Sequence, residues 1–153
     1  MSGAAYLSAK SAYISGGGLV QIYTEETNRV ILQQLLPEAI VSTYTAYEEE
    51  ALASLLKWAD VVCIGCGLGK SKVSEQILEY VLRHLEIPCV IDADGLNLLA
   101  RKKELLPQEA KEIILTPHMK EMAGMIGCTV SELAERRFEK LQKFVGDYGV
   151  VCA

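Results

Sequence analysis

The chain has 153 residues, of which 50% are hydrophobic and 23% charged, so we expect one globular domain rather than a disordered segment. Its net charge of −5 argues against a nucleic-acid-binding protein, because no basic surface is available to neutralise phosphates. No apolar run approaches the length of a membrane span and the first residues lack signal-peptide order, so we expect a cytoplasmic protein without a membrane partner.

Strand and helix patterns alternate along the chain, beginning with a helix over 2–15 that Ser2 can cap and that three glycines end. Further helices are predicted over 28–36, 48–58, 73–85, 95–100 and 129–145, the last opening on the capping-box spacing of Thr129 and Glu132. Strands are predicted over 19–24, 39–43, 61–64, 89–91, 113–115 and 149–152. Short apolar strands separated by helices predict one mainly parallel sheet of six strands, covered by helices on both faces.

Five cysteines stand at positions 63, 66, 89, 128 and 152, mostly within apolar runs. That placement predicts buried, reduced thiols, which are typical of a cytoplasmic protein. The Cys63-x-x-Cys66 spacing also occurs in metal and redox sites. Because no second Cys or His pair stands at ligand spacing, we interpret both residues as buried thiols and predict no metal site.

Three motifs follow predicted strands, and the first is a glycine loop containing Gly65, Gly67 and Gly69. It has neither the spacing of a P-loop nor the third interval of a Rossmann fingerprint. Such a loop lets the backbone approach a ligand closely and opens towards a helix N-terminus that favours anions. The alternative is a tight turn without a binding role.

The second motif places Asp92, Asp94 and Asn97 after the predicted strand 89–91. On an extended chain, Asp92 and Asp94 would point to one side, where they could hold a hydrated Mg²⁺ or contact ligand hydroxyls. The alternative is that Asp94 caps the helix 95–100 while Asp92 ends the strand.

The third motif is Thr116-Pro117-His118, followed by Glu121. Thr116 is predicted as an N-cap and Pro117 as the first helical residue, which puts His118 in the first turn beside the backbone donors. His118 and Glu121 also have the spacing of metal ligands, but the sequence supplies no further ligand, and a surface or capping histidine is the alternative.

Together these motifs resemble those of the ADP- or ATP-dependent NAD(P)H-hydrate dehydratases, a branch of the ribokinase-like superfamily. The family's Gly-Pro-Gly-Leu-Gly stands here as Gly-Cys-Gly-Leu-Gly at 65–69, and its Leu-Thr-Pro-His-Pro-Gly-Glu as Leu-Thr-Pro-His-Met-Lys-Glu at 115–121. The family's other signatures are matched by Ser-Gly-Ala-Ala at 2–5, Gly-Gly-Gly-Leu-Val at 16–20 and Asp-Ala-Asp-Gly-Leu-Asn at 92–97. The resemblance implies a three-layer ribokinase-like α/β fold with a mainly parallel central sheet, here incomplete.

The resemblance also implies a function, which is the repair of hydrated NADH or NADPH. A nucleotide, ADP or ATP, with Mg²⁺, phosphorylates the ring hydroxyl before elimination. The hydrate-binding residues of the family would fall at Ala4, Gly67 and His118. Supporting residues would be Gly65, Gly69, Asp92, Asp94, Asn97, Thr116 and Glu121. Cys66 in place of proline, and Met119-Lys120 in place of Pro-Gly, would change the shape of the pocket without removing these residues.

The family pattern extends beyond this chain at both ends. It places a strand and a glycine turn before the Ser-Gly-Ala-Ala helix, and later a Lys-Gly nucleotide-binding segment and a Gly-Thr-Gly-Asp motif with the catalytic aspartate. We therefore expect residues 1–153 to be one partial domain that supplies mainly the hydrate-binding side, with no catalytic residue identified and turnover left open. Uncovered sheet edges also predict a homo-oligomer. The alternatives are another ribokinase-like kinase, of the hydroxyethylthiazole or sugar type, and a non-catalytic nucleotide-binding or oligomer-forming module.

Overall fold

The computed structural model describes residues 1–106 and 112–153. Its helices are α1 (Ser2–Ile14), α2 (Arg29–Leu35), α3 (Glu49–Trp58), α4 (Lys72–Arg83), α5 (Asp94–Leu99), α6 (Met119–Ile126), α7 (Val130–Glu135) and α8 (Arg137–Tyr148), with 3₁₀ turns η1 (Glu26–Asn28) and η2 (Lys103–Leu105). Its strands are β1 (Gln21–Glu25), β2 (Ile40–Tyr44), β3 (Val62–Ile64), β4 (Cys89–Ile91), β5 (Ile113–Leu115) and β6 (Val151–Cys152). The order confirms the alternation of helix and strand that the sequence predicts.

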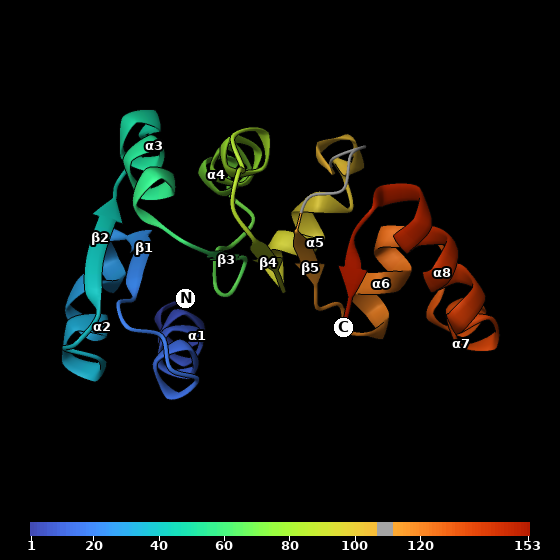
Figure 1. The fold of residues 1–153 in the computed structure, drawn as a ribbon, viewed down its shortest axis with the longest axis horizontal. Coiled ribbons are helices and arrows are strands. Elements are labelled where there is room, and N and C mark those ends of the chain that lie inside the picture. The colour runs from blue at the N-terminus through green and yellow to red at the C-terminus, as the bar shows by residue number, and fades with distance from the viewer. Residues whose placement is uncertain (107–111) are drawn as a thin grey trace.

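All strand pairs are parallel, as predicted, but they form two sheets instead of one. β1 pairs with β2 over five positions, from Gln21–Ile40 to Glu25–Tyr44. The second sheet has the order β3-β4-β5-β6. Figure 1 shows β1 and β3 facing each other across the gap between the two sheets. The prediction of a single sheet was wrong because hydrophobic pattern and propensity identify strands, whereas the pairing of distant edges depends on the tertiary arrangement.

Helices cover both faces of the strands, which gives the three layers that the family resemblance implies. α3 and α4 lie on one side, and α1 and α2 on the other (Figure 1). α4 begins at Ser71, whose Oγ accepts a hydrogen bond from the Ser74 backbone N–H at 3.1 Å. No helix in the described ranges is long and apolar enough to cross a membrane.

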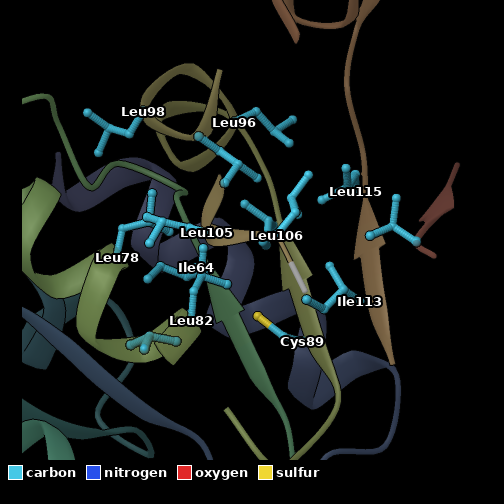
Figure 2. Packing of buried hydrophobic residues seen from close by; sticks show 14 of the residues in the cluster. Ile64, Leu78, Leu82, Cys89, Leu96, Leu98, Leu105, Leu106, Ile113 and Leu115 are labelled. Atoms are coloured by element: carbon cyan, nitrogen blue, oxygen red, sulfur yellow. The ribbon is translucent and has the colours of Figure 1, made fainter. Parts of the chain in front are cut away.

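The larger hydrophobic core joins α4, α5 and α6 to the four-stranded sheet. Leu78 and Leu82, one turn apart on α4, pack beside Ile64 of β3 and Cys89 of β4 (Figure 2). Burying a leucine side chain of this kind contributes about 1.5–3 kcal/mol to folding. A second, smaller core joins α1, β1 and α2 and contains Ala9, Ile22, Leu32, Leu36 and Ala39. The larger core also takes in Tyr44 of β2 and Leu52 of α3, so it extends across both sheets.

The helix predicted over 129–145 is two helices, α7 and α8, separated at Arg136. The capping box predicted at Thr129 is present, because Thr129 Oγ1 accepts from the Glu132 N–H and the Glu132 carboxylate accepts from the Thr129 N–H. At α1, the predicted cap was wrong: Ser2 is the first helical residue and its side chain makes no capping hydrogen bond.

Candidate functional site

The loops that follow β3, β4 and β5 lie at the same edge of the four-stranded sheet, because the three strands are parallel. The first turn of α1 joins them there, and together they enclose an open pocket of about 760 Å³. Of the residues predicted for the site, the following line this pocket: Ala4, Gly67, Asp92, Asp94, Asn97, Thr116 and Glu121. Gly65, Gly69 and His118 lie at the same edge but do not line it.

Gly65 packs the glycine loop directly against the backbone that follows β4. Its φ is +120°, and a Cβ at this position would stand 1.8 Å from the Asp92 carbonyl oxygen and 2.7 Å from the Gly95 nitrogen. No residue other than glycine fits there without displacing the backbone. This contact fixes the position of the loop relative to Asp92.

Gly67 brings the loop to the start of α1. Its φ is +77°, and a Cβ there would stand 2.5 Å from the Met1 carbonyl oxygen and 3.2 Å from the Ala4 Cβ. The amino group of Met1 donates a hydrogen bond to the Gly67 carbonyl at 2.7 Å. Ala4 and Gly67 are therefore in contact range across two elements, and both need to be small.

Asp94 holds the glycine loop instead of capping a helix. Its Oδ2 accepts a hydrogen bond from the Gly69 backbone N–H at 3.0 Å, whereas α5 has no side-chain cap. The interpretation of Asp94 as a cap was therefore wrong, because the carboxylate reaches a donor on another loop. Asn97 donates to the Ala93 carbonyl at 3.0 Å and so supports the same turn.

The backbone between Asp92 and Asp94 also differs from the extended conformation that the sequence predicts. Between them, Ala93 adopts φ +48° and ψ −116°, so the chain is not extended at this point. Positive φ is rare for residues other than glycine and costs about 1–3 kcal/mol, and such strained residues cluster at functional sites. The Ala93 turn, rather than strand alternation, directs Asp92 and Asp94 towards one pocket.

The cysteine prediction is corrected at Cys63, which is exposed, while only Cys89 is buried and the other three are intermediate. Cys63 lies on β3, whose edge away from β4 has no partner strand in the described part of the chain. A hydrogen bond from the Cys66 thiol, helped by the Ser8 hydroxyl at 3.7 Å, lowers the pKa of Cys63 to about 6. The same pairing and burial raise the pKa of Cys66, and while Cys63 keeps its own proton the Cys66 Sγ–H is donated to Asp92 Oδ2 at 3.5 Å instead.

His118 is the N-cap of α6, which corrects the assignment of Thr116 to that role. Its Nδ1 accepts hydrogen bonds from the backbone N–H groups of Lys120 and Glu121 at 3.1 and 3.3 Å. The Glu121 carboxylate accepts in return from the His118 backbone N–H at 3.0 Å. Thr116 is instead tied to β4, since its backbone N–H donates to the Ile91 carbonyl at 3.2 Å. The capping alternative for His118 was therefore correct.

The other nitrogen of His118, Nε2, lies 3.1 Å from Glu121 Oε1. The Glu121 side chain is 8% exposed and the His118 side chain 64% exposed. Because Nδ1 accepts two hydrogen bonds, we assign the imidazole proton to Nε2, where it is donated to Glu121. The described residues contain no group of three or more His, Cys, Asp or Glu side chains that could hold a metal ion.

Sequence reasoning missed the contribution of α1 beyond its first turn. Ser8 and Ser11 line the pocket beside Ala4. Their spacing of four and seven residues from Ala4 puts all three on one face of a helix, and this signal was available in the sequence.

Known proteins give the same picture of the whole chain. The family model described as NAD(P)H-hydrate dehydratase matches residues 1–152. The chain belongs to the NAD(P)H-hydrate dehydratase family. The ADP-dependent (S)-NAD(P)H-hydrate dehydratase of Lactiplantibacillus plantarum is 36% identical over 99% of this chain and 54% of its own length. The bifunctional NAD(P)H-hydrate repair enzyme of Escherichia coli is 35% identical over 99% of this chain and 28% of its own length.

Solved structures of similar proteins share the fold. A ribokinase-like superfamily protein from Enterococcus faecalis matches with a TM-score of 0.85 and 25% identity, over 98% of this chain and 51% of its own. The ADP/ATP-dependent NAD(P)H-hydrate dehydratase of Bacillus subtilis, co-crystallised with ATP/Mg²⁺, matches with a TM-score of 0.74 and 27% identity, over 99% of this chain and 52% of its own. The ribokinase-like α/β fold is therefore confirmed. The chain spans about half the length of the dehydratases that it matches, and less of the bifunctional enzymes.

Proposed function

We propose that the pocket binds the hydrated form of NADH or NADPH and forms the hydrate-binding side of an ADP- or ATP-dependent dehydratase. The observation that carries this proposal is the convergence of Ala4, Gly67 and Asp92 on one pocket from three separate elements. Membership of the dehydratase family supports the choice of substrate. In this proposal Ala4 and Gly67 contact the hydrate, and Asp92 accepts a hydrogen bond from one of its hydroxyl groups. His118 contacts the hydrate at the rim of the pocket.

The charges of the pocket orient the substrate within it. Asp92, Asp94 and Glu121 make one side acidic, which repels phosphates but accepts hydrogen bonds from the hydroxyls of a ribose or of a hydrated nicotinamide ring. The start of α1, beside Gly67, offers backbone N–H groups of the kind that bind phosphates. We therefore propose that the diphosphate lies towards α1 and the hydrated ring towards Asp92.

Turnover requires further groups. Phosphoryl transfer followed by elimination needs donors for the phosphoryl group and a base near the hydroxyl that is phosphorylated. The three pocket carboxylates already have partners: Cys66 for Asp92, Gly69 for Asp94 and His118 for Glu121. None stands where the family resemblance puts its catalytic aspartate. We therefore propose that these 153 residues bind the hydrate without converting it.

Binding is tested by titration calorimetry with NADPH hydrate, using His118→Ala and His118→Asn. Asparagine keeps an acceptor that can cap α6, so His118→Asn should fold as stably as the parent chain. Both variants should bind NADPH hydrate about tenfold more weakly, which corresponds to about 1.4 kcal/mol. His84→Ala is the matched control, because His84 lies at the end of α4 and stacks on Tyr80. Absence of hydrate binding, or an equal loss in His84→Ala, would contradict the proposal.

Turnover is tested by following NADH absorbance after the purified chain is mixed with NADH hydrate and either ADP or ATP. We expect no recovery of NADH above the uncatalysed rate. Recovery that disappears in Asp92→Asn would show that Asp92 is the base and that the chain is a working enzyme.

A further inference from the structure

Two thiols share one wall of the candidate pocket, and neither contacts the hydrate in the proposed function. Cys63 lies on β3 and Cys66 in the glycine loop, and both line the pocket of about 760 Å³. Val62 and Ile64 pack into the larger core, so Cys63, which lies between them on the strand, points to the opposite face. There its Sγ lies 3.7 Å from the Ser8 Oγ of α1. Small molecules that enter the pocket therefore reach the Cys63 sulfur.

The glycine loop brings the second thiol back to the first. Gly65, with a φ of +120°, turns the chain directly after β3, and Cys66 follows it. The Cys66 thiol donates a hydrogen bond to the Cys63 thiolate, which is the largest cause of the low pKa of Cys63, about 6. Cys63 is therefore mostly thiolate at neutral pH, and the thiolate is the nucleophilic form of cysteine. An exposed cysteine of low pKa with a second cysteine beside it is typical of redox-sensitive sites.

Asp92 supplies a proton acceptor for the second thiol. Its Oδ2 lies 3.5 Å from the Cys66 Sγ. While Cys63 is a thiolate, the Cys66 proton is held between the two sulfurs, which raises the pKa of Cys66. Loss of the negative charge on Cys63 removes that hydrogen bond, and the Cys66 proton then faces the Asp92 carboxylate. Cys66 becomes a nucleophile at the stage when Cys63 has been oxidised.

We propose that Cys63 and Cys66 form a modification site for hydroperoxides, which oxidise the pair to a disulfide. The Cys63 thiolate attacks the peroxide: a sulfur–oxygen bond forms, the oxygen–oxygen bond breaks, and the departing hydroxide takes a proton from solvent. The Cys66 sulfur then attacks the sulfenic acid on Cys63, so that the disulfide forms and the sulfur–oxygen bond breaks. The Cys66 proton passes through Asp92 to the departing hydroxide, which leaves as water. The two sulfurs lose two electrons in total, and the peroxide gains them.

The test is oxidation of the reduced, purified chain with hydrogen peroxide, followed by tryptic digestion and mass spectrometry. Both cysteines fall in the tryptic peptide of residues 58–70, which contains no other cysteine. We expect this peptide to lose the mass of two hydrogen atoms and to resist alkylation, and dithiothreitol should reverse both changes. Cys128, which is partly buried and does not line the pocket, is the internal control. Cys63 should be oxidised about tenfold faster than Cys128 or more.

Substitutions separate the two steps. In Cys66→Ser the serine keeps a hydroxyl donor beside Cys63, so Cys63 should still be oxidised, but its sulfenic acid should persist and be trapped by dimedone. Cys63→Ser should give neither the dimedone adduct nor the disulfide, whereas the matched Cys128→Ser should behave as the parent chain. Asp92→Asn should slow closure of the disulfide about tenfold without slowing formation of the sulfenic acid, because only the second step needs the proton acceptor.

Three results would overturn the proposal. The first is oxidation of Cys63 no faster than that of Cys128, and the second is a Cys63 sulfenic acid that persists in the parent chain as long as in Cys66→Ser. The third is a disulfide between two copies of the chain, seen as a dimer in non-reducing electrophoresis, in place of the bond within the peptide. Closure at an unchanged rate in Asp92→Asn would overturn the role of Asp92 as proton acceptor.

Discussion

Substitution of Gly65 by alanine tests how the glycine loop is held against β4. A Cβ at this position overlaps the Asp92 carbonyl oxygen at 1.8 Å, so the loop or the Asp92 backbone must move by more than an ångström. The φ of +120° adds a backbone cost of about 1–3 kcal/mol. Movement also weakens two hydrogen bonds of 2.9 and 3.0 Å, Gly95 N–H to Asp92 O and Asp92 N–H to Ile64 O, each of about 1 kcal/mol. We expect a total loss of about 3–5 kcal/mol.

The matched control is Gly127→Ala. Gly127 has a comparable positive φ of +83°, but nothing lies within 4 Å of its Cβ position. It should therefore cost only the backbone strain, about 1–2 kcal/mol. The assay is urea unfolding of both variants followed by far-UV circular dichroism. Equal losses in the two variants would refute the close packing of the glycine loop on β4.

Four further variants or measurements test other parts of the structure. Ala93→Gly should raise the free energy of unfolding by about 1 kcal/mol, since glycine tolerates φ +48°, and a destabilised variant would contradict this turn. Gly146 lies inside α8 with open space at its Cβ position, so Gly146→Ala should raise the free energy of unfolding by about 0.5–1 kcal/mol in the same urea assay. Alkylation of Cys63 should reach half its maximal rate near pH 6, because only the thiolate reacts and its pKa is about 6, whereas Cys89, with a pKa of about 12, stays inert until unfolding. Removal of the hydrogen bond in Cys66→Ala should move the Cys63 midpoint to higher pH, and an unchanged midpoint would assign the shift to another group.

Local features of the fold were predictable because neighbouring residues determine them. The strands 89–91 and 113–115 were predicted with their observed bounds from short apolar runs. The capping box at Thr129 and Glu132 depends on one turn of helix and is present as predicted. Parallel pairing of the strands follows from their alternation with helices.

The structure also brought the three predicted motifs to one edge of the sheet. This convergence follows from parallel strands alone, because their carboxyl ends must lie together. The structure shows where Gly67, Asp92 and Glu121 lie, whereas their roles in binding are predictions.

Other features depend on contacts between distant residues, which sequence patterns do not contain. Thr116 is held by the Ile91 carbonyl, so α6 begins later and His118 becomes its cap. Asp94 reaches the Gly69 N–H, 25 positions away, in place of its own helix. Cys63 is exposed on β3, which pairs only with β4 in the described chain. The sequence by itself determined the family, the elements and the parallel topology, since these follow from motifs and local pattern. Only the tertiary structure decided which carboxylates hold the loop, which residue caps α6 and where the sheet divides, because each depends on which distant backbone groups meet.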